Sequence, residues 1–457
     1  MLNCVMAMVL AASFLAGPVK PIDNCNTKEK VKYTDEGTKA KVISEYTSPD
    51  GLCNIKYNGI YYDVTLYEEE ASPYDVGIAY GKAINEIYPE YVSSMEPYLW
   101  ENIRCAFPFA TNEFTGVEKR VRALYDTLDI KYKREIDGLT TGLGVKDRGL
   151  KPDGVLSIEE VMVAQMIPDC LRQGACSGLS LWGSKTDTGD MLAVRCLEWR
   201  FGKDNSMCKA HSVLHIKEGD RSITSIGFLG LLDVISGVND KGLFAAIIDV
   251  GTDQKYSDKG KICYSFETRH ILETFDNAKD AGNYMVDNSD SYTYSHNIML
   301  TDGKEAYCAE DACAQAKEDG KAYSILRDNK TPIMKDIKWD SPDSLCIVNS
   351  YVSKGNFDLM TGNKSNAVRF AKYNKWVKET KSFNMAKLKE TMTQESVDAN
   401  GFASNVVQNV HRDDMAQMIL LDYHNGNVQA AFTGVEGVVD KPVFYEVEKI
   451  PVSQNNN

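Results

Sequence analysis

Cys176 has the setting of a cysteine that acts as a nucleophile. It lies in the run Gly174-Ala175-Cys176-Ser177-Gly178, where every neighbour is small. The thiolate is the reactive form of cysteine, and a free cysteine near neutral pH is mostly thiol, so a base is needed. If the chain is cut between Ala175 and Cys176, the freed α-amine has a pKa of about 7.7–8.0 and can take the thiol proton. The residues therefore predict a cysteine that becomes a new N-terminus and uses its own amine as the base.

Two charged residues follow at a spacing that suits this chemistry. The residues after Cys176 predict a hairpin of two strands joined by a turn at 185–190. Arg195, on the second strand, would favour the thiolate and disfavour the ammonium, because it is a fixed positive charge. Glu198 could accept from the amine or hold the Arg195 side chain. Side chains three residues apart on a regular strand point to opposite faces, so both reach Cys176 only if the strand bends or ends near Cys196.

A structural role for Cys176 is the alternative, because the chain has 12 cysteines. Without Cys176 and Cys4, five disulfides could form among the remaining cysteines, and their connectivity stays open. No C-x-x-C pair occurs, and Cys308 and Cys313 lack partnering histidines, so we expect no metal site. The cysteines that could pair are Cys25, Cys53, Cys105, Cys170, Cys196, Cys208, Cys263, Cys308, Cys313 and Cys346.

The string CSGLSLWGSKTDTGDMLAVRCLEW resembles the nucleophile hairpin of a known enzyme family. This is the acyl-CoA:6-aminopenicillanic acid (isopenicillin-N) acyltransferase family of cysteine N-terminal-nucleophile (Ntn) hydrolases, related to choloylglycine hydrolases, penicillin V acylases and acid ceramidase. The family pattern continues with Arg-Asn-x-Asp and an aromatic residue, where this chain has Arg195-Cys196-Leu197-Glu198-Trp199. Cys196 thus replaces the usual Asn, and Glu198 replaces the usual Asp with a side chain one methylene longer.

Further motifs follow the family's order and imply three more site residues. By resemblance, Asn239 offers its backbone N–H to the oxyanion, the Asn349 side chain completes the oxyanion hole, and Arg369 supports the active site. Without the resemblance, Asn239 is an ordinary turn residue, Asn349 a polar residue at a strand end and Arg369 a solvated helix arginine. The resemblance runs from about residue 70 to the end, with motifs at 77–82, 236–243, 297–310, 347–351 and 367–370.

The chain divides into three parts. Residues 1–17 predict a signal peptide, because they are apolar, end in small residues and are too short to span a bilayer; a buried first helix is the alternative. Residues 18–175 predict a largely helical pro-segment or light subunit, with a small hairpin between residues 52 and 64 and a helix that begins at an N-cap, Ser157. Residues 176–457 predict the Ntn-hydrolase catalytic core.

The order of elements predicts the α+β class. After Cys176 strands dominate, and they are interrupted by helices at about 266–285 and 366–380. This order is not the regular alternation of a parallel α/β fold. It fits two packed sheets with helices outside, and the resemblance implies an αββα four-layer sandwich.

Composition limits the partners. The chain of 457 residues is 43% hydrophobic and carries a formal net charge of −14, which disfavours nucleic acid and anionic membrane surfaces. No segment beyond the N-terminus approaches transmembrane length. The predicted export favours a secreted protein or one of the lysosomal or vacuolar lumen, in which Asn329 and Asn363 lie in glycosylation sequons.

These observations predict a secreted precursor that cuts its own bond between Ala175 and Cys176. The thiol attacks the preceding carbonyl, and water resolves the ester-linked intermediate. The two fragments stay associated, and the mature enzyme hydrolyses a small linear amide, or transfers its acyl group, through an acyl-thioester on Cys176 without a cofactor. The alternatives are a lipid amidase or phospholipase-B-like hydrolase on the same fold, and a catalytically silent secreted binding protein. A papain-type protease is less favoured, because no Cys-Gly-x-Cys-Trp motif occurs.

Overall fold

The computed structural model describes residues 32–107, 116–171, 175–250, 260–318, 320, 322–356, 364–394 and 410–452. The residues from Tyr33 onward belong to one compact unit. The predicted signal peptide and the second sequon residue, Asn363, lie outside the described residues, as does Gly174.

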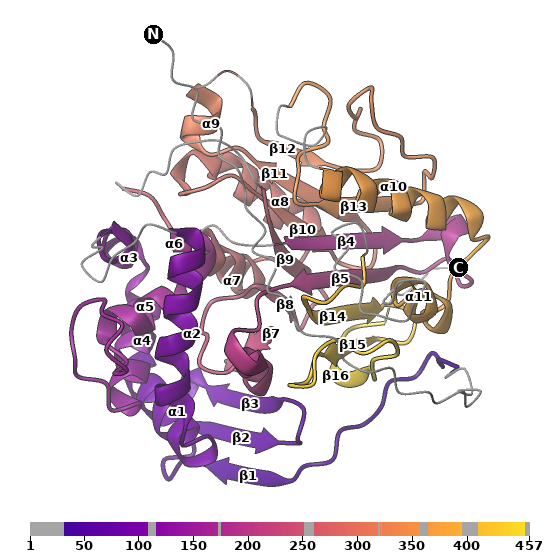
Figure 1. Ribbon diagram of the computed structural model, residues 1–457. Coiled ribbons are helices and arrows are strands. Elements are labelled where there is room, and N and C mark those ends of the chain that lie inside the picture. The colour runs from indigo at the N-terminus through magenta and orange to yellow at the C-terminus, as the bar shows by residue number, and fades with distance from the viewer. Residues whose placement is uncertain are drawn as a thin grey trace, which may run out of the picture. The chain divides into compact units, whose positions relative to one another are not determined.

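Two β-sheets make up the centre of this unit (Figure 1). All described strand pairs are antiparallel except β3 with β6. The ten-stranded sheet runs in the order β1 (Ser44–Thr47), β2 (Cys53–Tyr57), β3 (Tyr62–Tyr67), β6 (His211–Glu218), β7 (Arg221–Phe228), β8 (Ser236–Asn239), β9 (Phe244–Asp249), β10 (His296–Thr301), β11 (Ala306–Asp311) and β12 (Ile325–Arg327). The six-stranded sheet runs in the order β13 (Ser344–Val348), β4 (Ala175–Leu181), β5 (Leu192–Glu198), β14 (Met415–Asp422), β15 (Asn427–Phe432) and β16 (Tyr445–Lys449).

Helices cover the outer faces of both sheets. On the six-stranded sheet, α10 (Lys364–Glu379) and α11 (Met385–Met392) pack through Phe370, Tyr373 and Leu388 against the apolar side chains of β4 and β5. On the ten-stranded sheet, α7 (Tyr264–Thr274) and α8 (Ala278–Asp287) pack against β8 to β11. The inner faces meet in the main core, where β4 contacts β9. The predicted α+β class with two sheets is therefore confirmed.

The residues before the predicted cleavage point form helices and also part of the sheet. The helices are α1 (Pro73–Ile87), α2 (Tyr91–Ala106), α3 (Gly116–Thr127), α4 (Ile130–Gly142), α5 (Ile158–Gln165) and α6 (Ile167–Leu171). The predicted hairpin is confirmed as β2 and β3, and the predicted N-cap at Ser157 is confirmed by a capping box with Glu160. Because β3 pairs with β6, this segment shares a sheet with residues that follow Cys176.

Close contact between α1 and α4 explains two glycines in the upstream segment. A Cβ at Gly77 would overlap the backbone carbonyl of Glu135, and one at Gly138 would overlap the carbonyl of Tyr74. The two backbones can approach this closely only because both positions lack a side chain. The packing of α1 on α4 therefore requires glycine at both positions.

The expected helix at 266–285 is two helices rather than one, so that prediction was wrong. The helix α7 ends at Thr274, and Asn277 then caps α8 by accepting a hydrogen bond from the Asp280 backbone nitrogen. An asparagine at this position competes for backbone groups and favours a helix start over a helix interior. The other expected helix is present as α10, whereas α11 was not predicted.

The structure gives no support to the disulfides that the cysteine count allowed, and Cys25 lies outside the described residues. Cys53, Cys176, Cys196, Cys208, Cys263, Cys308 and Cys346 are free and buried, and Cys105 is free and exposed. Cys196, Cys308 and Cys346 lie on strands and are at most 1% exposed, so they behave as small apolar core residues. Because these positions are already filled by packing, each sulfur contributes to the core without a covalent partner.

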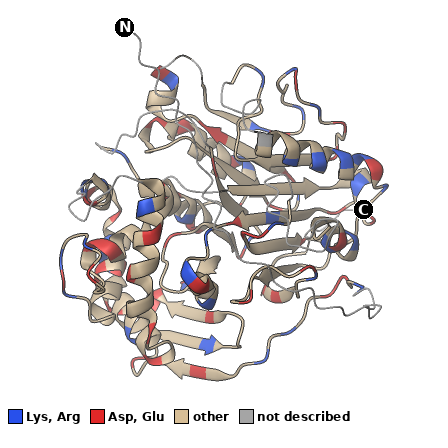
Figure 2. Ribbon diagram, viewed as in Figure 1, with Lys and Arg blue, Asp and Glu red and all other residues tan. Residues whose placement is uncertain are grey.

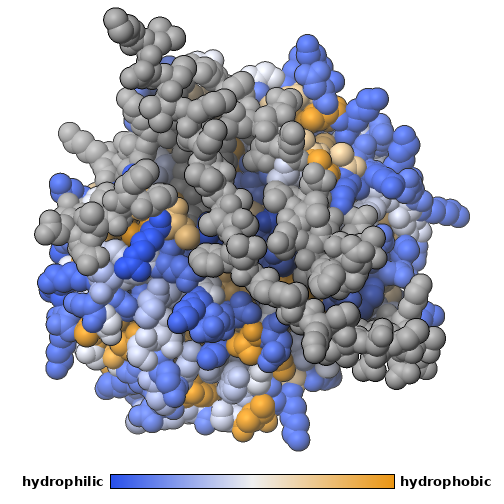
Figure 3. All heavy atoms as spheres, in the orientation of Figure 1, coloured by the Kyte–Doolittle hydropathy of each residue, from blue (hydrophilic) through white to orange (hydrophobic). Residues whose placement is uncertain are grey.

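Charged and apolar residues are spread over the surface. Figure 2 shows Lys and Arg residues following α10, with acidic residues distributed over many elements. The face in Figure 3 is largely hydrophilic, with small separate hydrophobic areas. Among the described residues, no helix has the length and apolar character to cross a membrane.

Candidate active site

Cys176 is the second residue of β4 and is almost completely buried, with 3% of its surface exposed. The nearest polar group to its sulfur is Arg195 on β5, whose Nη2 donates to the Cys176 Sγ at 3.3 Å and to the Ile247 carbonyl oxygen at 3.1 Å. The Nε and Nη1 of Arg195 have no hydrogen-bond partner among the described residues. The predicted contact between the guanidinium and the thiol is therefore present in this structure.

The backbone of Cys176 is held by two buried side chains from distant parts of the chain. Its N–H donates to the Oδ1 of Asn349 at 2.6 Å, and its carbonyl oxygen accepts from the Nη1 of Arg369 at 3.0 Å. Arg369 also donates through Nη2 to the Asn349 Oδ1 at 2.8 Å. Asn349 and Arg369 thus fix the backbone of Cys176 on both sides of its Cα.

Glu198 pairs with Arg369 and does not hold Arg195 as the sequence suggested. The Oε1 of Glu198 lies 3.2 Å from the Nη1 of Arg369. In the β4–β5 ladder Arg195 lies opposite Gly178, whereas Glu198 lies opposite Ala175. Arg195 therefore faces the other sheet and Glu198 faces α10, so the two side chains occupy opposite faces as three-residue spacing requires. The strand does not bend to bring them together; Arg369 connects Glu198 to Cys176 instead.

Asn366, which the sequence analysis did not identify, fixes both Arg369 and Asn349. It lies one helical turn before Arg369 on α10, and its Oδ1 accepts from the Arg369 Nη2 at 2.8 Å. Its Nδ2 donates to the Asn349 carbonyl oxygen at 2.9 Å and to the Ser350 Oγ at 2.7 Å. The i, i+3 spacing of 366 and 369 is the only local signal for this role, and it is common in helices.

The structure does not bring Asn239 to the site. Its backbone N–H donates to the Leu243 carbonyl oxygen at 3.0 Å, within the turn between β8 and β9. Its side chain bonds to the Leu272 and Phe275 carbonyl oxygens. Cys176 is instead close to the other end of β9, where Asp249 lies. The donors of Asn239 are thus engaged within its turn and at the end of α7, and its role as an oxyanion donor stays a prediction.

Asp249 and Tyr264 are site residues that sequence reasoning missed. The backbone carbonyl oxygen of Asp249 accepts from the Nδ2 of Asn349 at 2.7 Å. Its carboxylate Oδ1 accepts from the hydroxyl of Tyr264 at 2.7 Å. The Asn349 amide nitrogen, expected to hold an oxyanion, is thus engaged by Asp249, and this bond turns the amide oxygen toward Cys176.

Electrostatics at the site are dominated by burial. Burial raises the pKa of the Cys176 thiol to about 12, although the Arg195 guanidinium opposes this shift. Burial also raises the pKa of Glu198 to about 7, and Arg369 opposes that shift. The Oε2 of Glu198 has no hydrogen-bond partner among the described residues. At neutral pH the thiol is therefore protonated, and the pKa of Glu198 lies near neutral pH.

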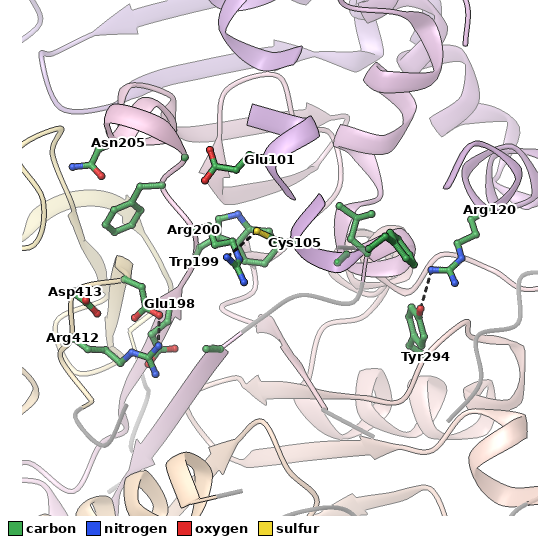
Figure 4. A pocket seen from close by; sticks show the side chains of 17 residues that line it. Glu101, Cys105, Arg120, Glu198, Trp199, Arg200, Asn205, Tyr294, Arg412 and Asp413 are labelled. Atoms are coloured by element: carbon green, nitrogen blue, oxygen red, sulfur yellow. Dashed lines mark hydrogen bonds and ion pairs between the residues drawn. The ribbon is translucent and has the colours of Figure 1, made fainter. Parts of the chain in front are cut away.

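A cavity of about 930 Å³ opens beside the predicted cleavage point. Ala175 and Glu198 line it, together with the aromatic side chains of Trp199 and Phe201. In Figure 4, Arg120 and Tyr294 lie at one end of this pocket and Glu198 at the other, with Arg200 between them. The volume fits a small molecule, and the mixture of aromatic and charged groups can bind a ligand with both apolar and polar parts.

One group of carboxylates among the described residues could hold a cation, but a lysine already lies within it. The group consists of Glu68, Glu218 and Glu273. The Lys131 Nζ is 2.9, 2.6 and 3.2 Å from their oxygens, so the group is an ion-pair network.

Asn329 is the sequon residue that the structure describes. Its side-chain Nδ2 donates a hydrogen bond to the Pro342 carbonyl oxygen.

Comparison with known proteins gives distant likenesses. No protein-family model matches the chain, and no curated protein matches it. A solved structure of a Caenorhabditis elegans N-acylethanolamine-hydrolyzing acid amidase ortholog is similar, with a TM-score of 0.36 and 11% identity over 54% of this chain and 92% of that chain.

Two bacterial enzymes are similar to a comparable extent. For a variant of conjugated bile acid hydrolase from Clostridium perfringens, the TM-score is 0.34 with 14% identity over 62% of this chain and 100% of that chain. For penicillin V acylase from Agrobacterium tumefaciens, it is 0.32 with 11% identity over 56% of this chain and 83% of that chain. The resemblance to the isopenicillin-N acyltransferase family stays a prediction.

Proposed function

We propose that this chain is a self-processing Ntn amidohydrolase that uses Cys176 as its nucleophile. The observation that supports this best is the set of contacts around Cys176. Its nitrogen, carbonyl oxygen and sulfur each contact a different buried polar side chain. A cysteine that only fills the core needs none of these contacts. Three buried polar groups around one residue are costly unless they serve a purpose, which supports a chemical role.

In the first step, the Cys176 thiol attacks the carbonyl carbon of Ala175. The C–N bond between the two residues breaks, the acyl group moves to sulfur, and the leaving nitrogen gains a proton to become an α-amine. Water then hydrolyses the thioester, which releases a carboxylate on Ala175 and restores the thiol. Arg195 stabilises the attacking thiolate, while Asn349 and Arg369 hold the leaving nitrogen and the carbonyl of Cys176 in place.

In the mature enzyme, the new α-amine of Cys176 takes the thiol proton and the thiolate attacks a substrate amide. The acyl group is held as a thioester on Cys176, the amine product leaves with a proton, and water or an amine accepts the acyl group. Arg195 keeps two buried nitrogens without partners, and these donors can stabilise negative charge in the transition state. Glu198 orients Arg369 through their ion pair.

The cavity beside Ala175 is the proposed substrate pocket. Ala175 lines the cavity whereas Cys176 does not, so cleavage and movement of Ala175 would open the thiol to it. A linear amide with an apolar acyl part fits the aromatic lining. The fragment before Cys176 stays bound after cleavage, because its strand β3 pairs with β6. Secretion or a lysosomal or vacuolar location, with glycosylation at Asn329 and Asn363, belongs to the same proposal.

A lipid amidase or phospholipase-B-like hydrolase on the same fold is the alternative substrate assignment, and a catalytically silent binding protein is the alternative class. The test is to incubate the mature protein with short acyl amides, fatty-acyl amides and glycerophospholipids, and to measure the mass of the peptide that begins at Cys176. An acyl adduct on that peptide with release of the amine supports the proposal. Release of the acyl group from glycerophospholipids but not from amides favours the phospholipase-B-like hydrolase. Binding without an adduct or turnover would favour the silent protein.

A further inference from the structure

We propose that Asp169, Tyr264 and Asp249 form a brace across the cleavable bond that positions Asn349 against the nitrogen of Cys176. This inference rests on the proposed self-processing function. Asp169 belongs to the fragment before the bond, whereas Tyr264 and Asp249 belong to the fragment after it. The three are positioning residues, because they act on Cys176 through Asn349.

The brace begins at α6, on the upstream side of the bond. The Oδ1 of Asp169 accepts from the Tyr264 backbone nitrogen at 2.8 Å, and its Oδ2 accepts from the Ser265 backbone nitrogen at 3.3 Å. These nitrogens are the first two of α7, whose own N-cap residue, Cys263, makes no side-chain cap. A carboxylate at the free N–H groups of a helix start is favourable. Asp169 therefore caps a helix that lies on the other side of the cleavable bond.

Tyr264 carries the connection from this helix start to β9. Its ring stacks on the His296 imidazole, with centroids 4.1 Å apart and an angle of 13° between the planes. The His296 Nδ1 donates to the Tyr294 carbonyl oxygen at 2.9 Å, and its Nε2 lies 3.2 Å from the Asp311 Oδ2. A backbone carbonyl oxygen only accepts, so the proton of the Tyr294 contact lies on Nδ1. The stacked ring restricts the plane of Tyr264 and hence the direction of its hydroxyl.

The last links run from the Tyr264 hydroxyl to Cys176. The hydroxyl donates to the Asp249 carboxylate at 2.7 Å, and the Asp249 carbonyl oxygen accepts from the Asn349 Nδ2 at 2.7 Å. This bond leaves the Asn349 Oδ1 as the acceptor for the Cys176 nitrogen at 2.6 Å. If the Asp249 backbone shifted, the Asn349 amide could rotate and present a donor to another donor, the Cys176 N–H, which is unfavourable. The brace thus keeps the amide in the orientation that holds the leaving nitrogen.

Tyr264→Phe isolates the hydroxyl, because the ring and its stack on His296 remain. A hydrogen bond to a charged acceptor is worth about 1.5–3 kcal/mol, which corresponds to roughly tenfold or more in rate if it is lost in the reacting geometry. Asp249→Ala removes the same bond from the other side. Asp249→Asn keeps an oxygen that can accept from Tyr264 and is the conservative rescue variant. Tyr292→Phe is the matched control, because Tyr292 also contacts His296, whereas its hydroxyl donates to the Met285 sulfur and not to Asp249.

The experiment is to synthesise the full-length chain and its variants in a cell-free translation reaction and to time the appearance of the fragment that begins at Cys176. We expect Tyr264→Phe and Asp249→Ala to slow processing at least about tenfold. Asp249→Asn should stay within about threefold of the natural chain, since a neutral acceptor still makes the bond. The double variant Tyr264→Phe/Asp249→Ala should be no slower than Asp249→Ala alone, because both remove one interaction.

Any of three results would overturn the brace while leaving self-processing intact. Tyr264→Phe could be processed as fast as the natural chain, the double variant could show the sum of the two single effects, or Tyr292→Phe could slow processing as much as Tyr264→Phe. If Tyr264→Phe fails to fold, as judged by its melting transition, the test rests on the ratio of the processing rates of Asp249→Asn and Asp249→Ala. Equal rates for these two variants would then overturn the brace. A natural chain that is never cut would overturn the proposed function and the brace together, which separates the two failures.

Discussion

The side-chain oxygen of Asn349 accepts a 2.6 Å hydrogen bond from the backbone nitrogen of Cys176, across 173 positions of sequence. In the uncut chain this nitrogen is part of the peptide bond to Ala175. In a cut chain it would be the α-amine that serves as the base. In the proposed reactions the same contact would hold the leaving group of self-cleavage and the base of later turnover, which would link both reactions to one asparagine.

Replacing Asn349 tests this link. We expect Asn349→Ala to slow self-processing by about tenfold or more, because the Cys176 nitrogen and Arg369 both lose their acceptor. The rate is measured as the growth of the downstream fragment on a gel. Asn356→Ala is a matched control, since Asn356 is buried to a similar degree, at 5% exposure against 6%, but bonds to Glu310 and Tyr323. Equal slowing by both variants would show a general loss of folding.

Arg195 should set the pH dependence of self-processing. Because its guanidinium lowers the pKa of the buried Cys176 thiol, removing the charge moves that pKa further up. Arg195→Met keeps an apolar side chain of similar length, and we expect its rate profile to shift to higher pH by about one unit or more. Arg195→Lys should restore part of the shift. A profile of Arg195→Met that coincides with the natural one would contradict this role.

Glu198 should make stability depend on pH in a defined window. Its pKa in the folded chain is about 7 against an ordinary value of 4.5, so the folded state favours the neutral acid. Its contribution is fully present below about pH 4.5 and is lost as the pH rises to about 7. The free energy of unfolding of the natural chain, relative to Glu198→Gln, should therefore fall between these values and then level off. Denaturant titrations across this range measure the difference, and a constant or rising difference would be inconsistent with the shift.

Gly178 should be essential for the contact between the two sheets. A Cβ there would overlap the Sδ of Met299 on β10. We expect Gly178→Ala to lower the free energy of unfolding by about 1–3 kcal/mol, and the addition of Met299→Ala to cost less than the sum of the two single changes. Gly434→Ala is the matched control, because no atom lies within 4 Å of its Cβ position. Calorimetric melting of the natural chain, the two single variants, the double variant and the control measures the effects, and strict additivity would show that the two residues do not meet.

Local patterns in the sequence identified the residues that lie on regular elements near Cys176. The alternation after Cys176 placed Arg195 and Glu198 on the next strand, and the three-residue spacing already required opposite faces, as the structure shows. The role of Arg369 as a support also agrees with its contacts. Patterns of this kind work because side-chain direction on a strand or helix follows from the backbone alone.

The rest of the site depends on contacts between segments far apart in the chain. Tyr264 and Asp249 meet only because α7 packs over β9, and no local pattern marks either residue. The motif around Asn239 likewise does not show that the Asn239 N–H donates to the Leu243 carbonyl oxygen within the turn. The cysteines show the same limit: the sequence shows their number but not that Cys196, Cys308 and Cys346 are buried among core side chains.

The measurement that tests the central claim most directly is the intact mass and N-terminal sequence of the purified chain beside Cys176→Ala. The account predicts a natural protein with a fragment that begins at Cys176, and an alanine variant that stays whole at this bond. A natural protein that remains uncut, or an alanine variant cut at the same bond, would contradict self-processing by Cys176.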